Sequence, residues 1–360
     1  MKSLEPGDTI GIIGGGQLAR MMASAAARLG FHTIILEPTP DCPAAQTANR
    51  QIVANYDDEK ALDELANLSD VITYEFENVP ARAVDRLAKK ATVLPKPAAL
   101  EVSQDRFTEK KFLNDSGIKT APWFLVDDRQ MLIAGLGNVG GKGILKSRRF
   151  GYDGKGQVRL DNPTEEEIDQ ALADIGNAPA ILEGFVPFKK EISVIAARDF
   201  DGNIAFYDCP ENVHRDGILR TSTVPASIDK KTVEAAQKAA KTVLHELDYI
   251  GVIGVEFFVL KDGSALANEL APRVHNSGHW TEAACLISQF EQHIRAVAGL
   301  PLGKTTRHSN CVMENLIGED VKRLPELLAE PQTFIDLYGK ADIRAGRKMG
   351  HIIRLTGRAE

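Results

Sequence analysis

The sequence has few cysteines and lacks a long apolar run. Its four cysteines, Cys42, Cys209, Cys285 and Cys311, lie far apart and form no C-x-x-C pair. This spacing suggests neither a zinc site nor a disulfide framework, and it fits a reducing cytoplasm. No stretch reaches the ~18 apolar residues of a membrane span. We therefore expect a cytoplasmic protein that does not enter a membrane.

Basic residues are in deficit as well. The 43 lysines and arginines are outnumbered by 50 aspartates and glutamates, which gives a formal net charge of -7. Binders of nucleic acid or of membrane surfaces need a broad basic field, so neither partner is expected. An anionic small substrate is compatible with this charge if the basic residues cluster locally.

Length and composition indicate a folded chain with more than one domain. The chain has 360 residues, of which 43% are hydrophobic and 26% charged, as in an ordinary globular protein. Single cores seldom grow beyond ~250 to 300 residues before a chain splits. We expect two or three domains, and a homodimer whose partners are small molecules.

Residues 1–100 alternate between apolar strands and amphipathic helices. Strands are expected at Thr9–Ile13, His32–Leu36, Val71–Tyr74 and Thr92–Leu94, with helices after Gly16, at Asp58–Leu68 and at Pro80–Lys89. Alternation of this kind predicts an α/β domain with a doubly wound parallel sheet.

The rest of the chain changes to an α+β pattern. Residues 101–300 are expected to form a second domain, with β-rich segments and helices at Ser103–Asp115, Lys230–Leu247 and Glu282–Ala298. Residues 301–360 contain apolar segments separated by turn residues, which predicts short strands of a small β-rich domain.

A glycine turn follows the first expected strand. Gly14, Gly15 and Gly16 precede Gln17, Leu18 and Ala19, which fits G-x-G-x-x-A, and Glu37 ends the next strand where a ribose-binding acid would lie. This pattern allows an NAD(P) site. The same glycines also serve any close approach to a phosphate, or a tight turn alone, so the ligand stays open.

A second glycine cluster spans residues 151–157. Gly151, Gly154 and Gly156 surround Lys155, and the run follows a strand that ends in Lys146. It is not a Walker loop, and it predicts a flap over phosphates, with a surface hairpin as the alternative. Lys146 on an apolar strand is explained best by a nucleotide phosphate.

Two carboxylates are expected to meet in a hairpin. Asp262-Gly263 is a two-residue turn signal between apolar runs, which would place Glu256 opposite Glu269. Directly opposed residues have Cβ atoms ~4.5 to 5.5 Å apart, where like charges repel. A Mg²⁺ ion with oxygen ligands would neutralise them. A register slip or one protonated carboxyl is the alternative.

Polar groups cluster at two further places. Arg273, His275, Asn276, Ser277 and His279 follow the hairpin at the place where a small anion would be held. Near the carboxyl terminus, Arg344, Arg347, Lys348 and His351 form a basic patch that suits a phosphomonoester, although a solvated loop would look the same. Glu183 and Glu191, at strand edges, could bind ribose hydroxyls or be solvated strand ends.

Several longer motifs resemble the ATP-grasp superfamily and, within it, the 5-(carboxyamino)imidazole ribonucleotide synthases of purine synthesis. The resemblance covers nearly the whole chain. Its motifs are GGGQLARM at Gly14, YEFENV at Tyr74, DRFTEK at Asp105, GYDGKGQ at Gly151, HRDGILRTS at His214, NELAPRVHNSGHW at Asn268 and GRKMGH at Gly346. Glu269 is followed by Leu270 and Ala271, whereas many ATP-grasp enzymes read E-x-N-P-R, and this branch shares that difference.

The resemblance implies a set of site residues. ATP would be surrounded by Arg106, Lys146, Gly151, Tyr152, Asp153, Gly154, Lys155, Gly156, Gln157, Glu183, Gly184, Phe185, Val186, Glu191, His214, Asn268 and Glu269. Mg²⁺ would be bound by Glu256 and Glu269. The ribonucleotide would meet Gly16, Gln17, Leu18, Glu75, Tyr152, Arg347 and Lys348. Catalytic roles would fall to Asp153, Arg273, His275 and Lys348.

The implied reaction is an ATP-dependent carboxylation of aminoimidazole ribonucleotide. ATP would phosphorylate bicarbonate to carboxyphosphate, and the carbon dioxide released from it would add to the exocyclic amine. Three alternatives are a formate-dependent glycinamide ribonucleotide transformylase, an NAD(P) oxidoreductase, and a non-catalytic nucleotide-binding subunit.

Overall fold

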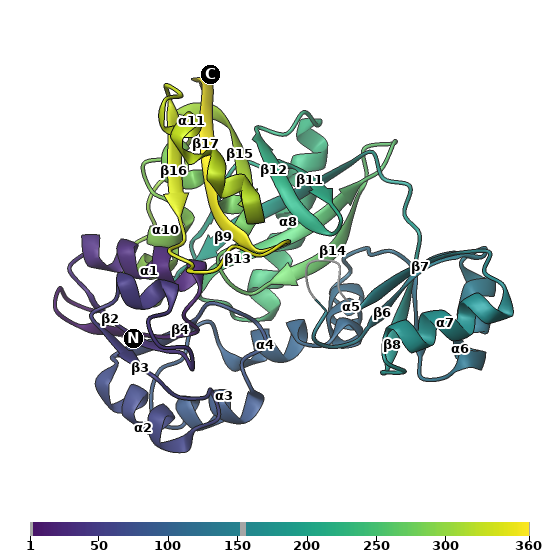
Figure 1. Cartoon of the computed structure of the whole chain (residues 1–360), viewed down its shortest axis with the longest axis horizontal. Helices are drawn as coiled ribbons and strands as arrows, with labels where there is room; N and C mark the ends of the chain where they lie inside the picture. The colour runs from purple at the N-terminus through teal and green to yellow at the C-terminus, as the bar shows by residue number, and fades with distance from the viewer. Residues whose placement is uncertain (1–2, 152–155, 360) are drawn as a thin grey trace.

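The computed structural model describes residues 3–151 and 156–359. Within these ranges the strands form a parallel sheet near the amino terminus, a large sheet in the middle and a small sheet at the opposite end of the molecule (Figure 1). In the described part of the chain, no helix is both long and apolar enough to cross a bilayer.

The first sheet is parallel, in the order β3-β2-β1-β4, with β1 (Thr9–Ile13), β2 (His32–Leu36), β3 (Arg50–Ile52) and β4 (Val71–Tyr74). Because side chains alternate along a strand, Ile10 and Ile12 pack with α1 (Gln17–Arg28), and Ile13 packs with α2 (Glu59–Leu68) and α3 (Ala81–Ala88). The predicted doubly wound sheet is confirmed.

Two short segments of the first domain differ from the prediction. β3 has only three residues, too few for a hydrophobic period to reveal it, and it is preceded by the 3-10 helix η1 (Pro43–Gln46). The strand predicted at Thr92–Leu94 is only an isolated parallel bridge between Ile72 and Val93.

Two helices connect the first domain to the remainder. The helix predicted at Ser103–Asp115 is α5 (Arg106–Asp115), and it is divided from a preceding helix, α4 (Pro97–Ser103), that was not predicted. The division falls at Asp105, whose backbone is extended and whose carboxylate accepts a 2.9 Å hydrogen bond from the N–H of Phe107. Asp105 therefore caps a new helix.

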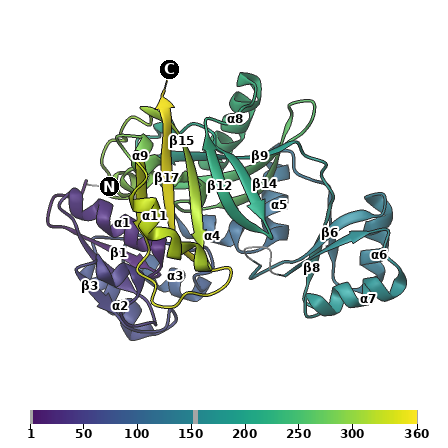
Figure 2. The ribbon, with the colours of Figure 1, turned by 45° about the horizontal axis from the view of Figure 1, so that its top comes forward.

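The small sheet is antiparallel and projects from one end of the molecule (Figure 2). Its order is β5-β8-β6-β7, with β5 (Trp123–Val126), β6 (Lys142–Ser147), β7 (Gln157–Asp161) and β8 (Ala180–Gly184). Leu145 of β6 packs in an apolar cluster with α6 (Arg129–Asn138) and α7 (Glu165–Asp174). Alternation along β6 turns Ile144 and Lys146 to the other face.

The large sheet has the order β14-β13-β9-β11-β12-β15-β17-β16, and β10 pairs with β9. Its strands are β9 (Lys190–Arg198), β10 (Ile204–Phe206), β11 (Glu211–Arg215), β12 (Ile218–Val224), β13 (Gly251–Val259), β14 (Ala265–Ala271), β15 (Ser309–Ile317), β16 (Thr333–Leu337) and β17 (Lys348–Arg358).

Helices cover both faces of this sheet. α8 (Lys230–Glu246) packs on one face with Val194 and Val255, and α10 (Gln289–Val297) packs on the other with Ile195 and Val252. α10 also contacts α1, so one apolar cluster joins the first domain to the large sheet. This shared core fixes the first domain beside the strands that carry the site.

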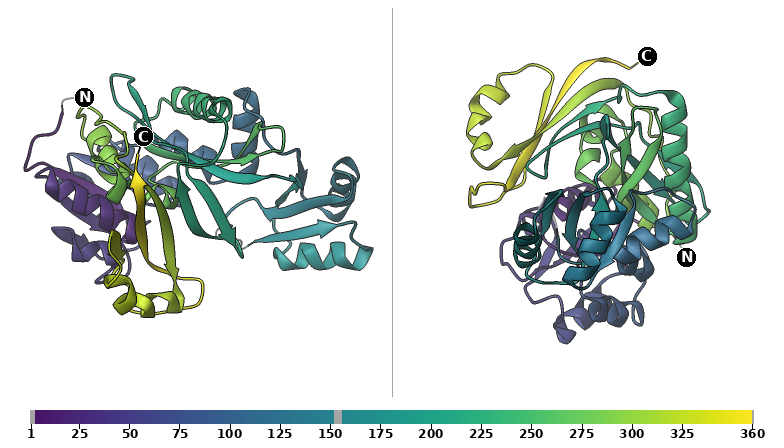
Figure 3. Two further views of the ribbon diagram at one scale, coloured as in Figure 1. Left: turned by 90° about the horizontal axis from the view of Figure 1, so that it is seen from above. Right: turned by 90° about the vertical axis from the view of Figure 1, so that its right-hand side faces the viewer.

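The carboxyl-terminal region differs from the prediction of short strands. β15 and β17 have nine and eleven residues, and they continue the large sheet because β15 pairs with β12. Both views of Figure 3 place these strands near the first domain, where Gln46 donates a 2.9 Å hydrogen bond to the carbonyl of Gly339. The shorter elements here are η3 (Gly318–Arg323) and α11 (Leu324–Leu328).

The helix predicted at Glu282–Ala298 is also divided. η2 (Asn276–Gly278) and α9 (Thr281–Ala284) precede α10. Cys285 ends α9 in an extended conformation and bridges to Arg307, and the hydroxyl of Ser288 then accepts a 3.3 Å hydrogen bond from the N–H of Glu291. Ser288 thus caps α10 as a separate helix.

Candidate active site

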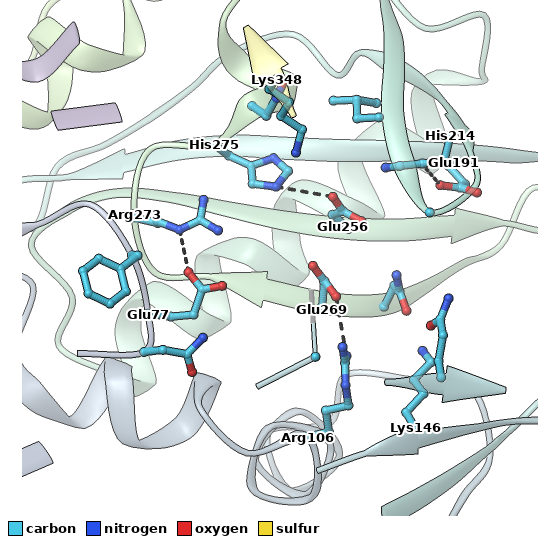
Figure 4. A pocket seen from close by; sticks show the side chains of 18 of the residues that line it. Glu77, Arg106, Lys146, Glu191, His214, Glu256, Glu269, Arg273, His275 and Lys348 are labelled. Carbon is cyan, nitrogen blue, oxygen red and sulfur yellow. Dashed lines mark hydrogen bonds and ion pairs between the residues drawn. The ribbon is translucent and has the colours of Figure 1, made fainter. Parts of the chain in front are cut away.

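A cavity of about 570 Å³ lies where the three sheets approach one another (Figure 4). Small-molecule sites typically have volumes of ~300 to 1,000 Å³. The lining residues are Gly16, Gln17, Leu18, Glu75, Phe76, Glu77 and Asn78 from the first domain, Arg106, Ile144, Lys146, Gly151 and Gln157 from α5 and the small sheet, and Phe188, Glu191, His214, Gly217, Leu219, Glu256, Phe258, Asn268, Glu269, Arg273, His275, Asn276 and Lys348 from the large sheet and its loops.

The hairpin of β13 and β14 has a different turn from the one predicted. Three residues, not two, separate Leu260 from Ser264, and the N–H of Leu260 donates to the carbonyl of Ser264 at 2.9 Å. Gly263 takes the left-handed conformation with φ of +82°, which suits glycine. The two-residue turn is therefore wrong, and Phe257 faces Ala267.

A β-bulge nevertheless brings the two glutamates together. Between the Phe257–Ala267 and Val255–Leu270 pairs, β13 contributes one residue, Glu256, and β14 contributes two, Asn268 and Glu269. All three line the cavity. Bulges of this kind redirect side chains and are frequent beside active sites. The two carboxylates are neighbours as predicted, but the cause is the bulge.

The glutamate pair is electrostatically strained. Burial, and then the charge of Glu269, raise the pKa of Glu256 to about 7. His275 Nε2 lies 3.4 Å from Glu256 Oε1, and Arg106 Nη1 lies 3.6 Å from Glu269 Oε2 (Figure 4). A cation near both carboxylates would remove their repulsion.

The donor set fits a metal that a substrate helps to bind. Within residues 3–151 and 156–359, no group of three or more His, Cys, Asp or Glu side chains could hold a metal ion. Glu256 and Glu269 would need oxygen ligands from a bound molecule. Mg²⁺ is usually bound in this way, by one or two carboxylates together with substrate phosphates.

Lys146 is a buried cation at the wall of the cavity. Its Nζ lies 3.1 Å from Glu183 Oε2, and Lys110 Nζ lies 3.5 Å from the same oxygen. Burial opposes ionisation of Glu183, but the two lysines hold its pKa at about 2. Glu183 is therefore not a solvated strand end, and it fixes the position of Lys146.

One end of the cavity is partly apolar. Phe188 and Phe258 stack with ring centroids 4.7 Å apart and planes 13° from parallel. Beside them, His214 Nδ1 lies 2.5 Å from Glu191 Oε2. Burial opposes protonation of His214, but the bond to Glu191 raises its pKa, which favours the protonated imidazole beside this carboxylate.

The glycine turn of the first domain is occupied by carboxylates of the chain. Glu75 accepts hydrogen bonds from the N–H groups of Gly16 and Ala19, the latter at 2.9 Å, and Glu37 accepts from Gly15 at 3.1 Å. These N–H groups would have to bind the pyrophosphate of a dinucleotide. Their occupation argues against the NAD(P) interpretation. Burial raises the pKa of Glu75.

The polar loop after β14 divides between the cavity and the interior. Arg273, His275 and Asn276 line the cavity, whereas Ser277 and His279 are fully buried beneath it. The interpretation of this loop as a single anion-binding group is therefore wrong for the last two residues. The density of polar residues along the sequence does not show which of their side chains point into the protein interior.

One cation of this loop, Arg273, is paired with a carboxylate of the first domain. Arg273 Nε donates to Glu77 Oε2 at 2.6 Å. Burial, and then the charges of Arg273 and Lys348, hold the pKa of His275 well below its usual value. His275 is therefore neutral.

The predicted basic patch near the carboxyl terminus is not a patch. Lys348 lines the cavity, but His351 is fully buried and Arg344 is exposed, with a 2.6 Å ion pair to Asp342. Arg347 Nη1 donates to the carbonyl of Asp342 at 2.9 Å and does not line the cavity. Of the four residues, Lys348 and His351 lie in β17, where alternation turns them to opposite faces, and Arg344 and Arg347 lie in the loop before it, so only Lys348 lines the cavity.

Some predicted ATP-site residues do not line this cavity directly. Gly156, Glu183, Gly184, Phe185 and Val186 are not among the lining residues, although Glu183 contacts Lys146. Tyr152, Asp153, Gly154 and Lys155 fall outside the described residues.

Sequence reasoning missed several lining residues, chiefly Phe76, Glu77, Asn78, Phe188 and Phe258. Two signals were available. The motif at Tyr74 contains Glu77 and Asn78, and Phe258 follows Glu256 by two residues, which places both on one face of a strand. Phe188 lies before β9 and had no such signal.

Comparisons with known proteins identify the family. Models of the ribonucleotide synthetase preATP-grasp domain, the ATP-grasp domain and the phosphoribosylaminoimidazole carboxylase C-terminal domain match residues 8–104, 111–290 and 311–360. The N5-carboxyaminoimidazole ribonucleotide synthase of Brucella melitensis is 69% identical over 99% of this chain and 98% of its own length.

Solved structures agree with this match. The N5-carboxyaminoimidazole synthetase of Staphylococcus aureus, complexed with ADP, is 39% identical with a TM-score of 0.94, covering 99% of this chain and 95% of that one. The enzyme of Aspergillus clavatus, in complex with ADP and 5-aminoimidazole ribonucleotide, is 30% identical with a TM-score of 0.91, covering 98% and 94%. The predicted ATP-grasp architecture is confirmed, and the chain belongs to the N5-carboxyaminoimidazole ribonucleotide synthase family of ATP-grasp ligases.

Proposed function

We propose that this enzyme carboxylates the exocyclic amine of 5-aminoimidazole ribonucleotide with ATP and bicarbonate. The γ-phosphoryl group passes to a bicarbonate oxygen, which releases ADP and forms carboxyphosphate. Carboxyphosphate divides into carbon dioxide and phosphate. The amine then adds to carbon dioxide and loses a proton, which leaves the carbamate.

The observation that carries the proposal is the continuity of the cavity. It joins the first-domain residues Gly16 and Glu75 to Lys146 on the small sheet, with Glu256 and Glu269 on the lining of the same space. A phosphoryl donor and a ribonucleotide could therefore bind in one space that the two carboxylates also face. Holding reactants together in this way accounts for much of the rate in such transfers.

Nucleotide would occupy the end formed by the small sheet. Lys146, fixed by Glu183, supplies a positive charge for the phosphates, and Phe188 with Phe258 supplies an apolar surface for the base. Glu191 is placed to accept hydrogen bonds from ribose hydroxyls.

Glu256 and Glu269 would hold Mg²⁺ together with phosphate oxygens. When bound, the ion offsets negative charge on the transferred phosphoryl group. The fit rests on the bulge that directs both carboxylates to the cavity and on their mutual repulsion.

The ribonucleotide would lie at the first-domain end. Gly16, Gln17 and Leu18 would contact its ring and ribose, and Lys348 would bind its phosphate. Arg273, beside Glu77, and His275, beside Glu256, would hold bicarbonate and carboxyphosphate by charge and hydrogen bonding.

The test is ADP release from complete and incomplete mixtures. We expect release to need ATP, magnesium, bicarbonate and 5-aminoimidazole ribonucleotide together, and ¹³C-bicarbonate to label the carbamate product. Glycinamide ribonucleotide with formate serves as the control pair. Rapid ADP release with glycinamide ribonucleotide and formate, and none with 5-aminoimidazole ribonucleotide and bicarbonate, would show that the reaction is formyl transfer and not carboxylation.

A homodimer in the cytoplasm remains part of the proposal. Its location is supported by the four buried cysteines, which are unpaired thiols as a reducing compartment would leave them. Analytical ultracentrifugation tests the assembly, and a monomer at micromolar concentration would contradict it.

A further inference from the structure

A chain of buried hydrogen bonds leads from His275 into the large sheet. His275 Nδ1 lies 2.8 Å from Ser277 Oγ, which lies 2.6 Å from Ser193 Oγ on β9. Asn212 Nδ2 on β11 donates to Ser193 Oγ at 3.1 Å, and Ser222 Oγ on β12 donates to Asn212 Oδ1 at 2.8 Å. All five side chains are buried, and of them only His275 lines the cavity.

These groups are unusual in the middle of a sheet. A hydroxyl or amide buried without a partner costs ~1 to 3 kcal/mol, so such residues stay in a core only when hydrogen-bonded. Valine or alanine would fill the same strand positions without that requirement. The network therefore needs an explanation beyond packing, and its one outlet is His275.

A backbone N–H group fixes the donor and acceptor roles along this series of hydrogen bonds. The N–H of Ser277 points at His275 Nδ1 at 3.4 Å, and a backbone N–H can only donate. Nδ1 therefore carries a lone pair and no proton. The hydroxyl of Ser277 then donates to Nδ1 as well, which leaves its oxygen to accept from Ser193.

The remaining members agree with this direction. Ser193 donates to Ser277 and accepts from the amide of Asn212, and Ser222 donates to the oxygen of Asn212. Each hydroxyl thus accepts or donates without conflict. In a neutral imidazole, a lone pair on Nδ1 places the proton on Nε2.

We propose that Ser277, Ser193 and Asn212 hold His275 as the Nε2–H tautomer, so that it meets the substrate anion as a hydrogen-bond donor. This rests on the proposed function only for the identity of the anion, which is bicarbonate or an acyl phosphate. Nε2 is the ring nitrogen on the cavity side, 3.4 Å from Glu256 Oε1. A protonated Nε2 cannot accept a proton from substrate, so His275 is not a general base. Ser277, Ser193 and Asn212 are positioning residues.

A substitution at Asn212 that reverses the donor and acceptor roles along the hydrogen-bond network provides the sharpest test. Asn212→Asp has nearly the same shape, but its carboxylate only accepts hydrogen bonds. Ser193 would turn to donate to Asp, Ser277 would turn to donate to Ser193, and His275 Nδ1 would lose its hydroxyl donor. Ser222→Ala is the matched control, because it removes a buried hydroxyl from the same network and leaves the amide of Asn212 as a donor.

The tautomer is read from ¹⁵N chemical shifts of the histidine rings in the whole enzyme, with His275→Gln assigning the signals among eight histidines. We expect a protonated Nε2 in the wild type and in Ser222→Ala, and a shift toward Nδ1–H in Asn212→Asp. In that variant kcat should fall at least ~10-fold, as for loss of an oriented donor, with the KM for ATP unchanged.

Each outcome decides the proposal. A wild-type proton on Nδ1 overturns it, and this holds even if the variants fail to fold. Equal ring shifts and equal kcat in Asn212→Asp and Ser222→Ala also overturn it, because the chain would then be structural only. The ring shifts do not depend on which reaction occurs, so failure of the carboxylation assay is a separate result.

Discussion

Glu109 on α5 accepts a 2.6 Å hydrogen bond from the backbone N–H of Leu270, next to the bulge that directs Glu269 to the cavity. The following residue, Lys110, donates to the carbonyl of Asn268. A bulge disrupts the ladder locally and leaves backbone groups to be paired otherwise. Both side chains are buried, so α5 holds the backbone that positions the carboxylate pair.

Two substitutions at Glu109 should differ sharply. Burial raises the pKa of Glu109 to about 8, against the charge of Lys110, so a neutral glutamine resembles its state near neutral pH. Glu109→Gln keeps an acceptor for Leu270 and should retain most of its kcat. Glu109→Ala leaves the N–H unpaired, at a cost of ~1 to 3 kcal/mol, and should raise the magnesium concentration for half-maximal rate. Calorimetry and magnesium titration measure both, and an unchanged titration in the alanine variant would contradict the role.

The first domain could be read from the sequence because its signals are local. Strands β1, β2 and β4 are buried on both faces, and their apolar runs have the bounds that the structure shows. The site depends on contacts across the chain. Glu109 and Leu270 are 161 positions apart, and no local pattern shows that they meet beside a bulge of β14.

Side-chain direction was the second limit. His279 and His275 lie four residues apart in one polar loop, yet the first is fully buried and the second lines the cavity. Outside helices and strands, no sequence period indicates which way a side chain points. The density of polar residues therefore predicted a polar loop at the site, but not which of its side chains line the cavity.

Replacing Glu269 tests the metal proposal. Glu269→Ala should reduce kcat at least ~100-fold, because half of the carboxylate pair is lost. Stability should hold or rise, since a like charge beside Glu256 is removed. The exposed Glu319 on η3 offers a control in Glu319→Ala. Wild-type ADP production by the Glu269 variant at limiting magnesium would refute the pair as a metal site.

Glu282 should make the unfolding free energy decrease as the pH rises toward 8. Burial, and then Asp336, raise the pKa of Glu282 to about 8, and burial lowers the pKa of His351 to about 3, so the pair is neutral at a separation of 3.8 Å. A raised folded-state pKa means that the stabilisation is complete below the unfolded value of ~4.3 and is lost as pH rises toward 8.

Glu282→Gln removes this loss. Relative to the wild type, the variant should gain roughly 1 to 3 kcal/mol of unfolding free energy between pH 5 and pH 8. Urea unfolding at several pH values measures it, with Glu319→Gln as the exposed control. Parallel stability curves for wild type and Glu282→Gln would show that Glu282 is ionised in the folded protein.

Lys348 decides the class of the second substrate. If its ammonium binds the ribonucleotide phosphate, Lys348→Met removes a charge-assisted contact worth ~1.5 to 3 kcal/mol and keeps most of the apolar stem. At ~1.4 kcal/mol per decade, the KM for ribonucleotide should rise roughly 10-fold to 100-fold. The KM for ATP should stay unchanged, because the proposed nucleotide site is at the other end of the cavity.

Arg347→Met is the matched control for Lys348→Met, since Arg347 is the adjacent cation, bonded to the carbonyl of Asp342 and not lining the cavity. It should leave the KM for ribonucleotide within about twofold, as for surface substitutions of up to ~0.5 kcal/mol. The dephosphorylated nucleoside completes the comparison: it should be a poor substrate for the wild type, and Lys348→Met should reduce its use much less, because the phosphate contact is already missing. Equal losses with nucleotide and nucleoside would place Lys348 at the reacting groups, beside His275, where it would act on carboxyphosphate.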